Sequence, residues 1–235
     1  MAAIDYTASN GNPTQMTSLH FNGEGYANQY EQALWNVGQV IEQYAYDRSF
    51  PVYGFGGVPR HMGIDQVSHC FAINDNPQDP RITGIVKIIE TYKESMKKIG
   101  LAGPTLFVPI LMKFYEYVIS VKDSLKYPIM LILTDGAIHD MTQTRDIIFK
   151  LAELPCSLIV IGVGNADFSA MEKLDGDGVS LRNTAGKVCK RDIVQFVRFN
   201  EAMSRGDLAG QVLKEVPGQL VSYMELNHIE VQPVQ

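Results

Sequence analysis

The chain has 235 residues, and its hydrophobic share of 46% is enough for the buried core of one large domain. Its 20 Lys and Arg against 26 Asp and Glu give a formal net charge of −6, whereas surfaces that hold nucleic-acid phosphates collect basic residues. Nucleic acid is therefore not an expected partner. The longest apolar run, Ile129 to Leu133, is far shorter than the roughly 20 residues of a membrane-spanning helix, so we expect a soluble protein.

The first elements in chain order are a short strand, a loop and a helix. Met1 to Ile4 is apolar and leads directly into Asp5, which is short for a buried central strand, so we expect the natural chain to continue upstream. Asn10 to Gly25 is rich in Asn, Gly, Thr and Ser and predicts a loop. Apolar residues then recur from Tyr30 to Tyr44 at spacings of three and four, which predicts an amphipathic helix.

Two short strands and a second helix follow. Phe50 to Phe55 predicts a strand that two glycines close. His69 to Ile73 predicts another, which the Asn, Asp and Pro cluster from Asn74 to Pro80 ends. Helical spacing then resumes from Ile82 to Ile99.

The second half of the chain repeats this alternation. A third helix is predicted from Phe107 to Val121, after the break at Gly100 to Pro104. Ile129 to Leu133 is apolar on both faces, which is typical of a parallel strand buried between helices. The remaining elements are a helix over Thr142 to Leu154, a strand over Ser157 to Val163, a short helix over Ala166 to Leu174, a strand over Val194 to Phe199 and a last helix over Leu208 to Met224, which Pro217 bends or restarts.

Strands that alternate with helices of this length predict a doubly wound α/β fold. We expect a mostly parallel, six-stranded, Rossmann-like sheet with helices on both faces. The sequence has no internal repeat and no low-complexity linker. We therefore expect one domain over residues 1–235, with a C-terminal helical extension over about 204–235.

Oxygen-bearing side chains stand where three predicted elements meet one edge of the sheet. Asp5, Thr7 and Ser9 follow the first strand, and the alternation of a strand can send them to the same side. Thr105 lies in a loop before a helix, and Asp135 comes directly after the buried run that ends at Leu133. In open α/β sheets the ligand site lies outside the carboxyl ends of the strands. These residues are therefore candidate ligands of one site.

Two carboxylates and three hydroxyls form an all-oxygen ligand set, which suits Mg²⁺ or Mn²⁺. Mg²⁺ prefers six near-octahedral positions and loses water reluctantly, so a site with few charged ligands keeps waters and an open position. A carboxylate from another molecule can take that position. Each of these residues alone is more often a cap or a turn former; their order along the fold favours the metal site.

The same stretches resemble the von Willebrand factor A-type domain, and within that class the copine family. The resemblance covers essentially the whole chain. The motifs that carry it are Asp5 to Pro13, Phe50 to Gly56, Leu101 to Thr105, Leu133 to Gly136, Ile161 to Gly164, Arg191 to Val197 and Glu215 to Leu220.

This resemblance implies a metal-ion-dependent adhesion site that begins with Asp-x-Ser-x-Ser in integrins, where Thr7 here replaces the first Ser. It implies that Thr7 and Ser9 bind the ion directly, that Thr105 binds directly or through water, and that Asp5 and Asp135 act mostly through water. It also implies an adaptor module that binds cytosolic proteins and is not an enzyme.

Copines are cytosolic proteins that carry two calcium- and phospholipid-binding modules before this domain, and this chain lacks them. We therefore expect a cytoplasmic protein whose full-length form is recruited to membranes through those modules. The cysteines agree with this location. Cys70, Cys156 and Cys189 are odd in number and never form a CxxC pair, so we interpret them as reduced thiols.

Two other functions fit parts of the sequence. A metal-dependent phosphatase of the haloacid-dehalogenase type could use Asp5 as nucleophile, but it normally needs a second carboxylate two residues on, where Thr7 stands. Plant RING-type ubiquitin ligases carry a similar A-type domain as their substrate-binding half. The cysteines of this chain form no RING, although a cargo-binding role of that kind stays open.

Overall fold

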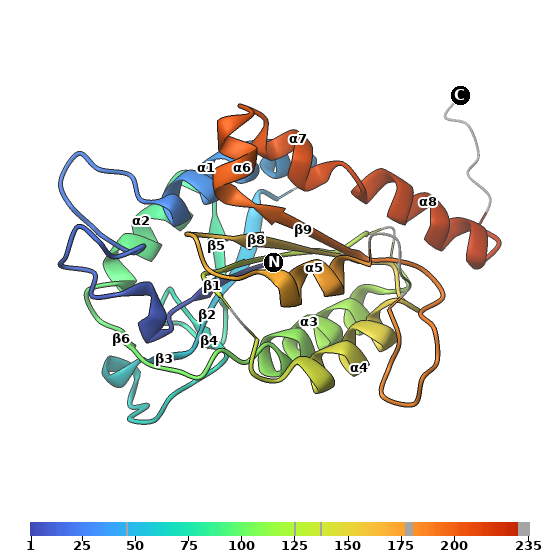
Figure 1. The fold of residues 1–235 in the computed structure, drawn as a ribbon, viewed down its shortest axis with the longest axis horizontal. Helices are drawn as coiled ribbons and strands as arrows, with labels where there is room; N and C mark the ends of the chain where they lie inside the picture. Colours follow the sequence, from blue (N-terminus) through green and yellow to red (C-terminus); the bar gives the residue numbers. More distant parts are fainter. Residues whose placement is uncertain (46, 125, 137, 177–180, 230–235) are drawn as a thin grey trace.

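The computed structural model describes residues 1–45, 47–124, 126–136, 138–176 and 181–229. In these ranges the chain forms a central sheet with helices on both sides (Figure 1). The strands are β1 (Ala2–Asp5), β2 (Ser49–Phe55), β3 (Gly57–Val58), β4 (Phe71–Ala72), β5 (Arg81–Thr83), β6 (Gly100–Leu101), β7 (Ile129–Thr134), β8 (Ser157–Gly162) and β9 (Val194–Arg198). The α-helices are α1 (Gln29–Tyr44), α2 (Ile85–Ser95), α3 (Val108–Val121), α4 (Met141–Leu151), α5 (Ser169–Asp175), α6 (Phe199–Ser204), α7 (Leu208–Leu213) and α8 (Val216–Leu226).

The main sheet has the strand order β4-β2-β1-β7-β8-β9, and the five strands from β2 to β9 in that run are parallel to one another. Strands β4 and β5 pair antiparallel with β2. Chain order therefore reverses on either side of β1, the first strand, as in a doubly wound fold. The predicted fold class is confirmed.

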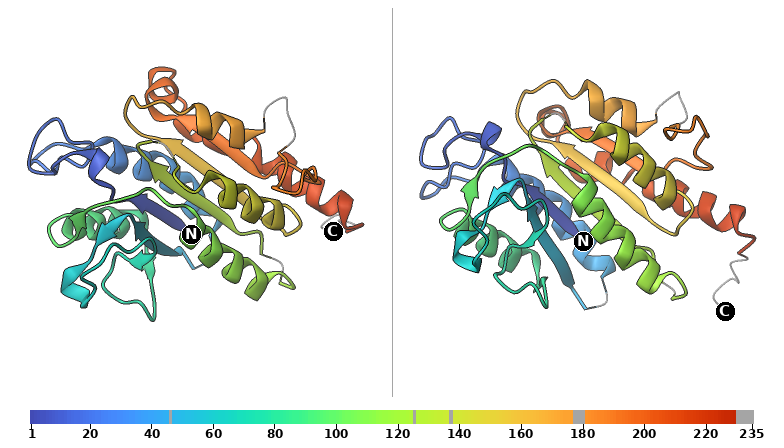
Figure 2. Two further views of the ribbon diagram at one scale, coloured as in Figure 1. Left: turned by 60° about the horizontal axis from the view of Figure 1, so that its bottom comes forward. Right: turned by 90° about the horizontal axis from the view of Figure 1, so that it is seen from below.

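Two apolar clusters cover the two faces of the sheet. One joins β1 and β7 to α1, α2 and α7, and the other joins β7 and β8 to α3, α4 and α5. Successive residues of β1 divide between them, since Ile4 belongs to the first cluster and Ala3 to the second. Figure 2 shows the helices on both sides of the strands. Burial on both faces explains why β7 and β8 are apolar throughout.

The sheet has seven strands where the sequence predicted six. The additional strand, β5, lies at the start of the predicted helix from Ile82 to Ile99 and pairs with β2, with Ile82 opposite Phe50. Its exposure alternates, with only Ile82 buried. Gly84 then turns the chain at φ +83, and α2 begins at Ile85. In the sequence, the one apolar residue of this short edge strand continues the apolar spacing of the helix after it, so the two elements looked like a single helix.

A short strand pair, β3 with β6, was not predicted, because each strand has two residues and lies in a stretch expected to be a turn. The predicted helix from Leu208 to Met224 is in fact two helices, α7 and α8. Pro217 stands in the first turn of α8, where its missing N–H leaves no helical hydrogen bond unmade.

Helix α8 is attached to the sheet mainly through polar groups. Gln219 is buried, and its side-chain oxygen accepts a hydrogen bond of 2.5 Å from Ser157 Oγ at the start of β8. Arg191 donates to the Gln219 carbonyl at 2.9 Å and lies 5.3 Å from the ring centre of Tyr223. Val221 stays about half exposed. The last part of the predicted extension, residues 230–235, lies outside the described residues.

Candidate metal site

The candidate site lies at the carboxyl ends of the two central strands, β1 and β7. Their parallel register puts Ile4 beside Leu133, so Asp5 and Thr134 end neighbouring strands at the same edge. The chain then leaves β1 through a short 3-10 helix, Ala8–Asn10, and leaves β7 through Asp135. Topology alone thus brings the Asp5–Ser9 segment to Asp135.

Asp5 is fully buried, and both of its carboxylate oxygens accept hydrogen bonds. Oδ1 accepts the backbone N–H of Thr7 at 2.8 Å, and Oδ2 accepts the hydroxyl of Thr134 at 2.6 Å. The first bond shapes the loop after β1, and the second ties that loop to β7. Asp5 is therefore fixed from both strands.

Thr7, Ser9 and Asp135 form a continuous chain of hydrogen bonds. The Ser9 hydroxyl donates to Asp135 Oδ1 at 3.0 Å, and the Thr7 and Ser9 hydroxyl oxygens are 2.9 Å apart. Because the Ser9 hydroxyl donates its only proton to the Asp135 carboxylate, the Thr7 hydroxyl is the donor in its hydrogen bond with the Ser9 oxygen. Hydrogen bonds thus connect four of the five predicted residues: Asp5 to Thr7, Thr7 to Ser9, and Ser9 to Asp135.

The fifth residue, Thr105, lies across a small cavity from these groups. Thr105, Ser9 and Asp135 line the same cavity, of about 490 Å³, which we call the site cavity. The Thr105 backbone is held by His139: its N–H donates to His139 Nδ1 at 3.3 Å, and its carbonyl accepts the His139 N–H at 3.0 Å. The structure therefore brings all five predicted residues to one place.

The electrostatics of the site are unfavourable for two bare carboxylates. Burial raises the pKa of Asp5 to about 6, and the nearby charge of Asp135 adds to this rise. Burial also raises the pKa of Asp135, against the hydrogen bond from Ser9. Within the described part of the chain, no Lys, Arg or His forms an ion pair with either group. Buried charges in proteins are normally paired or bound to metal.

The donor atoms fit a hard divalent cation. They are two carboxylates and three hydroxyls, with no thiol or imidazole among the predicted ligands, and oxygen sets of this kind suit Mg²⁺ or Mn²⁺. Among the described residues no three His, Cys, Asp or Glu side chains gather into one group. Three of the five predicted ligands are uncharged hydroxyl groups, and a Mg²⁺ site with few charged ligands keeps water in its shell.

The sequence did not single out two residues that support the loop. The Asn10 side chain donates to the Thr7 carbonyl at 3.1 Å. Gly56, at the end of β2, has φ +75, and a Cβ there would lie 2.3 Å from the Thr7 methyl carbon. Two consecutive glycines after β2 are a sequence sign that another part of the chain packs closely against the backbone there. The hydrogen-bond partners of Asn10 have no such sign in the sequence.

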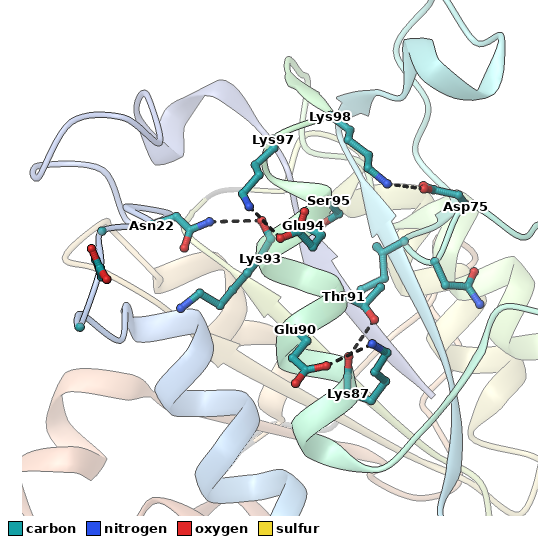
Figure 3. Close-up of a pocket in the computed structure, with 15 residues that line it drawn as sticks. Asn22, Asp75, Lys87, Glu90, Thr91, Lys93, Glu94, Ser95, Lys97 and Lys98 are labelled. Carbon is teal, nitrogen blue, oxygen red and sulfur yellow. Dashed lines mark hydrogen bonds and ion pairs between the residues drawn. The ribbon is translucent and has the colours of Figure 1, made fainter.

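A second cavity, of about 790 Å³, lies beside α2 and contains none of the predicted site residues. We call it the lysine cavity; Figure 3 shows its four lysines with their neighbours. Each ammonium group meets a carboxylate. The pairs are Lys87 with Glu90 at 3.1 Å, Lys93 with Glu31 at 3.2 Å, Lys97 with Glu94 at 2.7 Å and Lys98 with Asp75 at 2.8 Å.

Comparison with known proteins gives a family and a structural neighbour. The chain is similar to a solved structure described as von Willebrand factor type A from Catenulispora acidiphila, with a TM-score of 0.42 and 14% identity, over 94% of this chain and 42% of that chain. This chain therefore spans less than half the length of that neighbour. The family model for Copine matches residues 18–232, which include Thr105 and Asp135 and begin after Ser9. With a match over most of its length, the chain belongs to the copine family.

Proposed function

We propose that this copine domain is a protein-interaction module that binds its partners through a divalent cation, Mg²⁺ or Mn²⁺, held by Asp5, Thr7, Ser9, Thr105 and Asp135. One observation carries the proposal. Two buried carboxylates, Asp5 and Asp135, have hydroxyl groups as their side-chain partners, and Asp135 lines an open cavity. A cation at this position compensates both charges.

The hydroxyl groups of Thr7 and Ser9 would hold the ion directly, and that of Thr105 directly or through water. Asp5 and Asp135 would supply most of the compensating charge through bound water. Asp5 also has a structural part, because its oxygens already accept from Thr7 and Thr134. The bound ion supplies a Lewis acid with an exchangeable coordination position. The site cavity gives access to that position for a carboxylate of a partner protein.

Binding, and not catalysis, is the role that we propose. A phosphoryl-accepting Asp5 would need an acid or base two residues on, and Thr7 there has its hydroxyl engaged with Ser9. We also propose that the partners are cytosolic proteins and that membrane recruitment of the full-length protein depends on other modules. Among the described residues, no helix is both long and apolar enough to cross a membrane.

Isothermal titration of the metal-stripped domain with Mg²⁺, Mn²⁺ and Ca²⁺ tests the proposal. We expect one ion to bind the unaltered domain, and binding to be lost in Asp5→Ala and in Asp135→Ala. Asp75→Asn is the matched control, because Asp75 is a carboxylate of the lysine cavity and has two partners of its own, Lys98 and His61. Circular dichroism of each variant confirms that the fold is kept.

Unchanged metal affinity in both Asp5→Ala and Asp135→Ala would refute the site. The next experiment measures whether the metal-loaded domain binds an acidic peptide and whether this binding requires the metal. Loss of that capture when the peptide's Glu is replaced by Gln is the expected result.

A further inference from the structure

A buried group of aromatic side chains lies directly under the Asp5–Asn10 loop. His20 comes from the long loop after it, Tyr30 from α1 and Tyr92 from α2, and all three are fully buried. The His20 ring stacks on Tyr30 with 4.2 Å between ring centres. Figure 1 shows α1, α2 and the chain's first loop toward the same end of the molecule, on the left of the view. This group shares no side chain with the five proposed metal ligands.

The hydrogen bonds of His20 fix its tautomer. Its Nε2 lies 2.8 Å from the Asp5 carbonyl oxygen, which only accepts, so Nε2 carries the proton and donates it. Its Nδ1 is then the acceptor, and Tyr92 OH, at 2.6 Å, is the donor. Asn28 donates to the Tyr92 oxygen at 3.3 Å, which completes that hydroxyl's bonds. A neutral imidazole therefore holds the backbone of Asp5 in place.

A second connection reaches the loop two residues later. Tyr30 OH donates to Asn10 Oδ1 at 2.6 Å, which turns the amide so that Asn10 Nδ2 donates to the Thr7 carbonyl at 3.1 Å. Tyr30 thus acts on Thr7 through one side chain. The Asp5 carbonyl thus accepts a hydrogen bond directly from His20, and the Thr7 carbonyl accepts one from Asn10, which Tyr30 orients.

We propose that His20 and Tyr30 are positioning residues of the metal site, which set its affinity by holding the backbones of Asp5 and Thr7. This inference rests on the proposed metal-binding function. Groups that orient metal ligands without touching the metal commonly contribute about 10-fold to 100-fold in metal affinity. The loop that they hold carries three of the five proposed ligands, Asp5, Thr7 and Ser9.

A control for this test is Tyr127, which lies outside the metal loop. Its partly buried hydroxyl donates to the Cys156 carbonyl at 2.9 Å, just before β8 begins. Because β7 and β8 are parallel, this bond lies at the amino ends of the strands, whereas the metal loop lies at the carboxyl ends. Tyr30→Phe and Tyr127→Phe therefore each remove a tyrosine hydroxyl that donates a hydrogen bond, but only Tyr30→Phe removes a contact that leads to Thr7.

The experiment is a Mg²⁺ titration by calorimetry of the unaltered domain, Tyr30→Phe and Tyr127→Phe, with thermal unfolding of each metal-free protein measured in parallel. We expect a loss of thermal stability in both variants. The Mg²⁺ affinity should fall about 10-fold to 100-fold in Tyr30→Phe and should not change in Tyr127→Phe. Equal affinities in the two variants would overturn the inference.

Substitution of His20 adds a rescue. A glutamine amide nitrogen can stand near the position of Nε2, so His20→Gln keeps a donor for the Asp5 carbonyl, whereas His20→Leu does not. We expect His20→Gln to bind Mg²⁺ more tightly than His20→Leu; the reverse order would count against the inference, and if either variant fails to fold the tyrosine pair decides. Absence of Mg²⁺ binding by the unaltered domain would instead overturn the proposed function itself.

Discussion

The lysine cavity and the site cavity differ in how their charged groups are balanced. In the lysine cavity every ammonium group is paired with a carboxylate, and most of these side chains are well exposed to water. At the candidate metal site, Asp135 lines the site cavity, Asp5 is fully buried nearby, and hydroxyl groups are the side-chain partners of both carboxylates. The first set of charges is complete within the chain. The second has no ion-pair partner among the described residues, which is why we propose a bound cation there.

The proposed metal site therefore does not rest on the number of charges around its cavity. The lysine cavity is the larger and carries more ionisable groups, but its exposed pairs gain little from one another because water screens them. Unbalanced charge under burial is the more informative sign. Four predictions test the contrast.

The largest expected effect is a pH dependence of the metal-free domain. Asp5 has its pKa raised to about 6 by burial, above the ordinary value of 3.8, so the folded state binds the proton more tightly than the unfolded chain. The stability that Asp5 contributes is therefore present below about pH 4 and is lost as the pH rises through about 6, a change on the order of 3 kcal/mol. Urea unfolding in the presence of a chelator measures it.

Asp5→Asn is the control for this pH dependence, because an amide does not titrate. We expect the unaltered domain to lose stability relative to Asp5→Asn between about pH 4 and pH 7. Parallel stability curves for the two proteins would contradict the buried-charge argument.

The second prediction concerns added metal. Mg²⁺ at about 100 times its dissociation constant should raise the free energy of unfolding at pH 7 by about 2.7 kcal/mol, since it binds the folded state alone. Urea unfolding with and without Mg²⁺ measures this gain. Asp135→Ala should gain nothing, and an equal gain in that variant would place the ion elsewhere.

The third prediction uses two glycines with the same backbone conformation. Gly56 and Gly63 both have φ +75, but a Cβ at Gly56 meets the Thr7 methyl at 2.3 Å whereas a Cβ at Gly63 meets nothing within 4 Å. Alanine at either position should cost about 1–2 kcal/mol for its positive φ. Only Gly56→Ala should also weaken Mg²⁺ binding, measured by calorimetry. The same Mg²⁺ affinity in both variants would show that Thr7 tolerates the displacement.

The smallest effect is expected in the lysine cavity. Lys98→Ala removes the ion pair with Asp75, whose two side chains are 45% and 35% exposed. The free energy of unfolding should change by less than about 1 kcal/mol, and Mg²⁺ affinity should not change. A larger loss of stability, measured by urea unfolding, would mean that this cavity is less screened than its exposure indicates.

The sequence predicted the fold best where burial is two-sided. The run from Ile129 to Leu133 became β7 because only a strand between two helical layers has apolar side chains on both faces. Short edge elements were less predictable. Strand β5 has three residues, and its one buried side chain, Ile82, continues the spacing of the helix after it, so periodicity cannot separate the two.

The candidate site was predictable to the extent that topology determines it. Asp5 and Asp135 follow neighbouring parallel strands, and so their proximity follows from the strand order. The support beneath them could not be predicted in the same way. The bond from His20 to the Asp5 carbonyl depends on how a long loop folds back, and the bond from Tyr30 to Asn10 depends on the rotation of α1. Both hydrogen bonds depend on how distant segments pack in three dimensions, which the spacing of residues in the sequence does not give.

The central position of β1 has a consequence for synthesis. Its neighbour β7 comes late in the chain: the hydrogen bond between Met1 and Ile129 spans 128 positions, and the one between Thr134 and Asp5 spans 129. A ribosome adding about 5–20 residues per second therefore exposes β1 for several seconds before its second neighbour exists. Because pairing over such separations is slow, the centre of the sheet and the two carboxylates at its edge should be among the last parts of this domain to form.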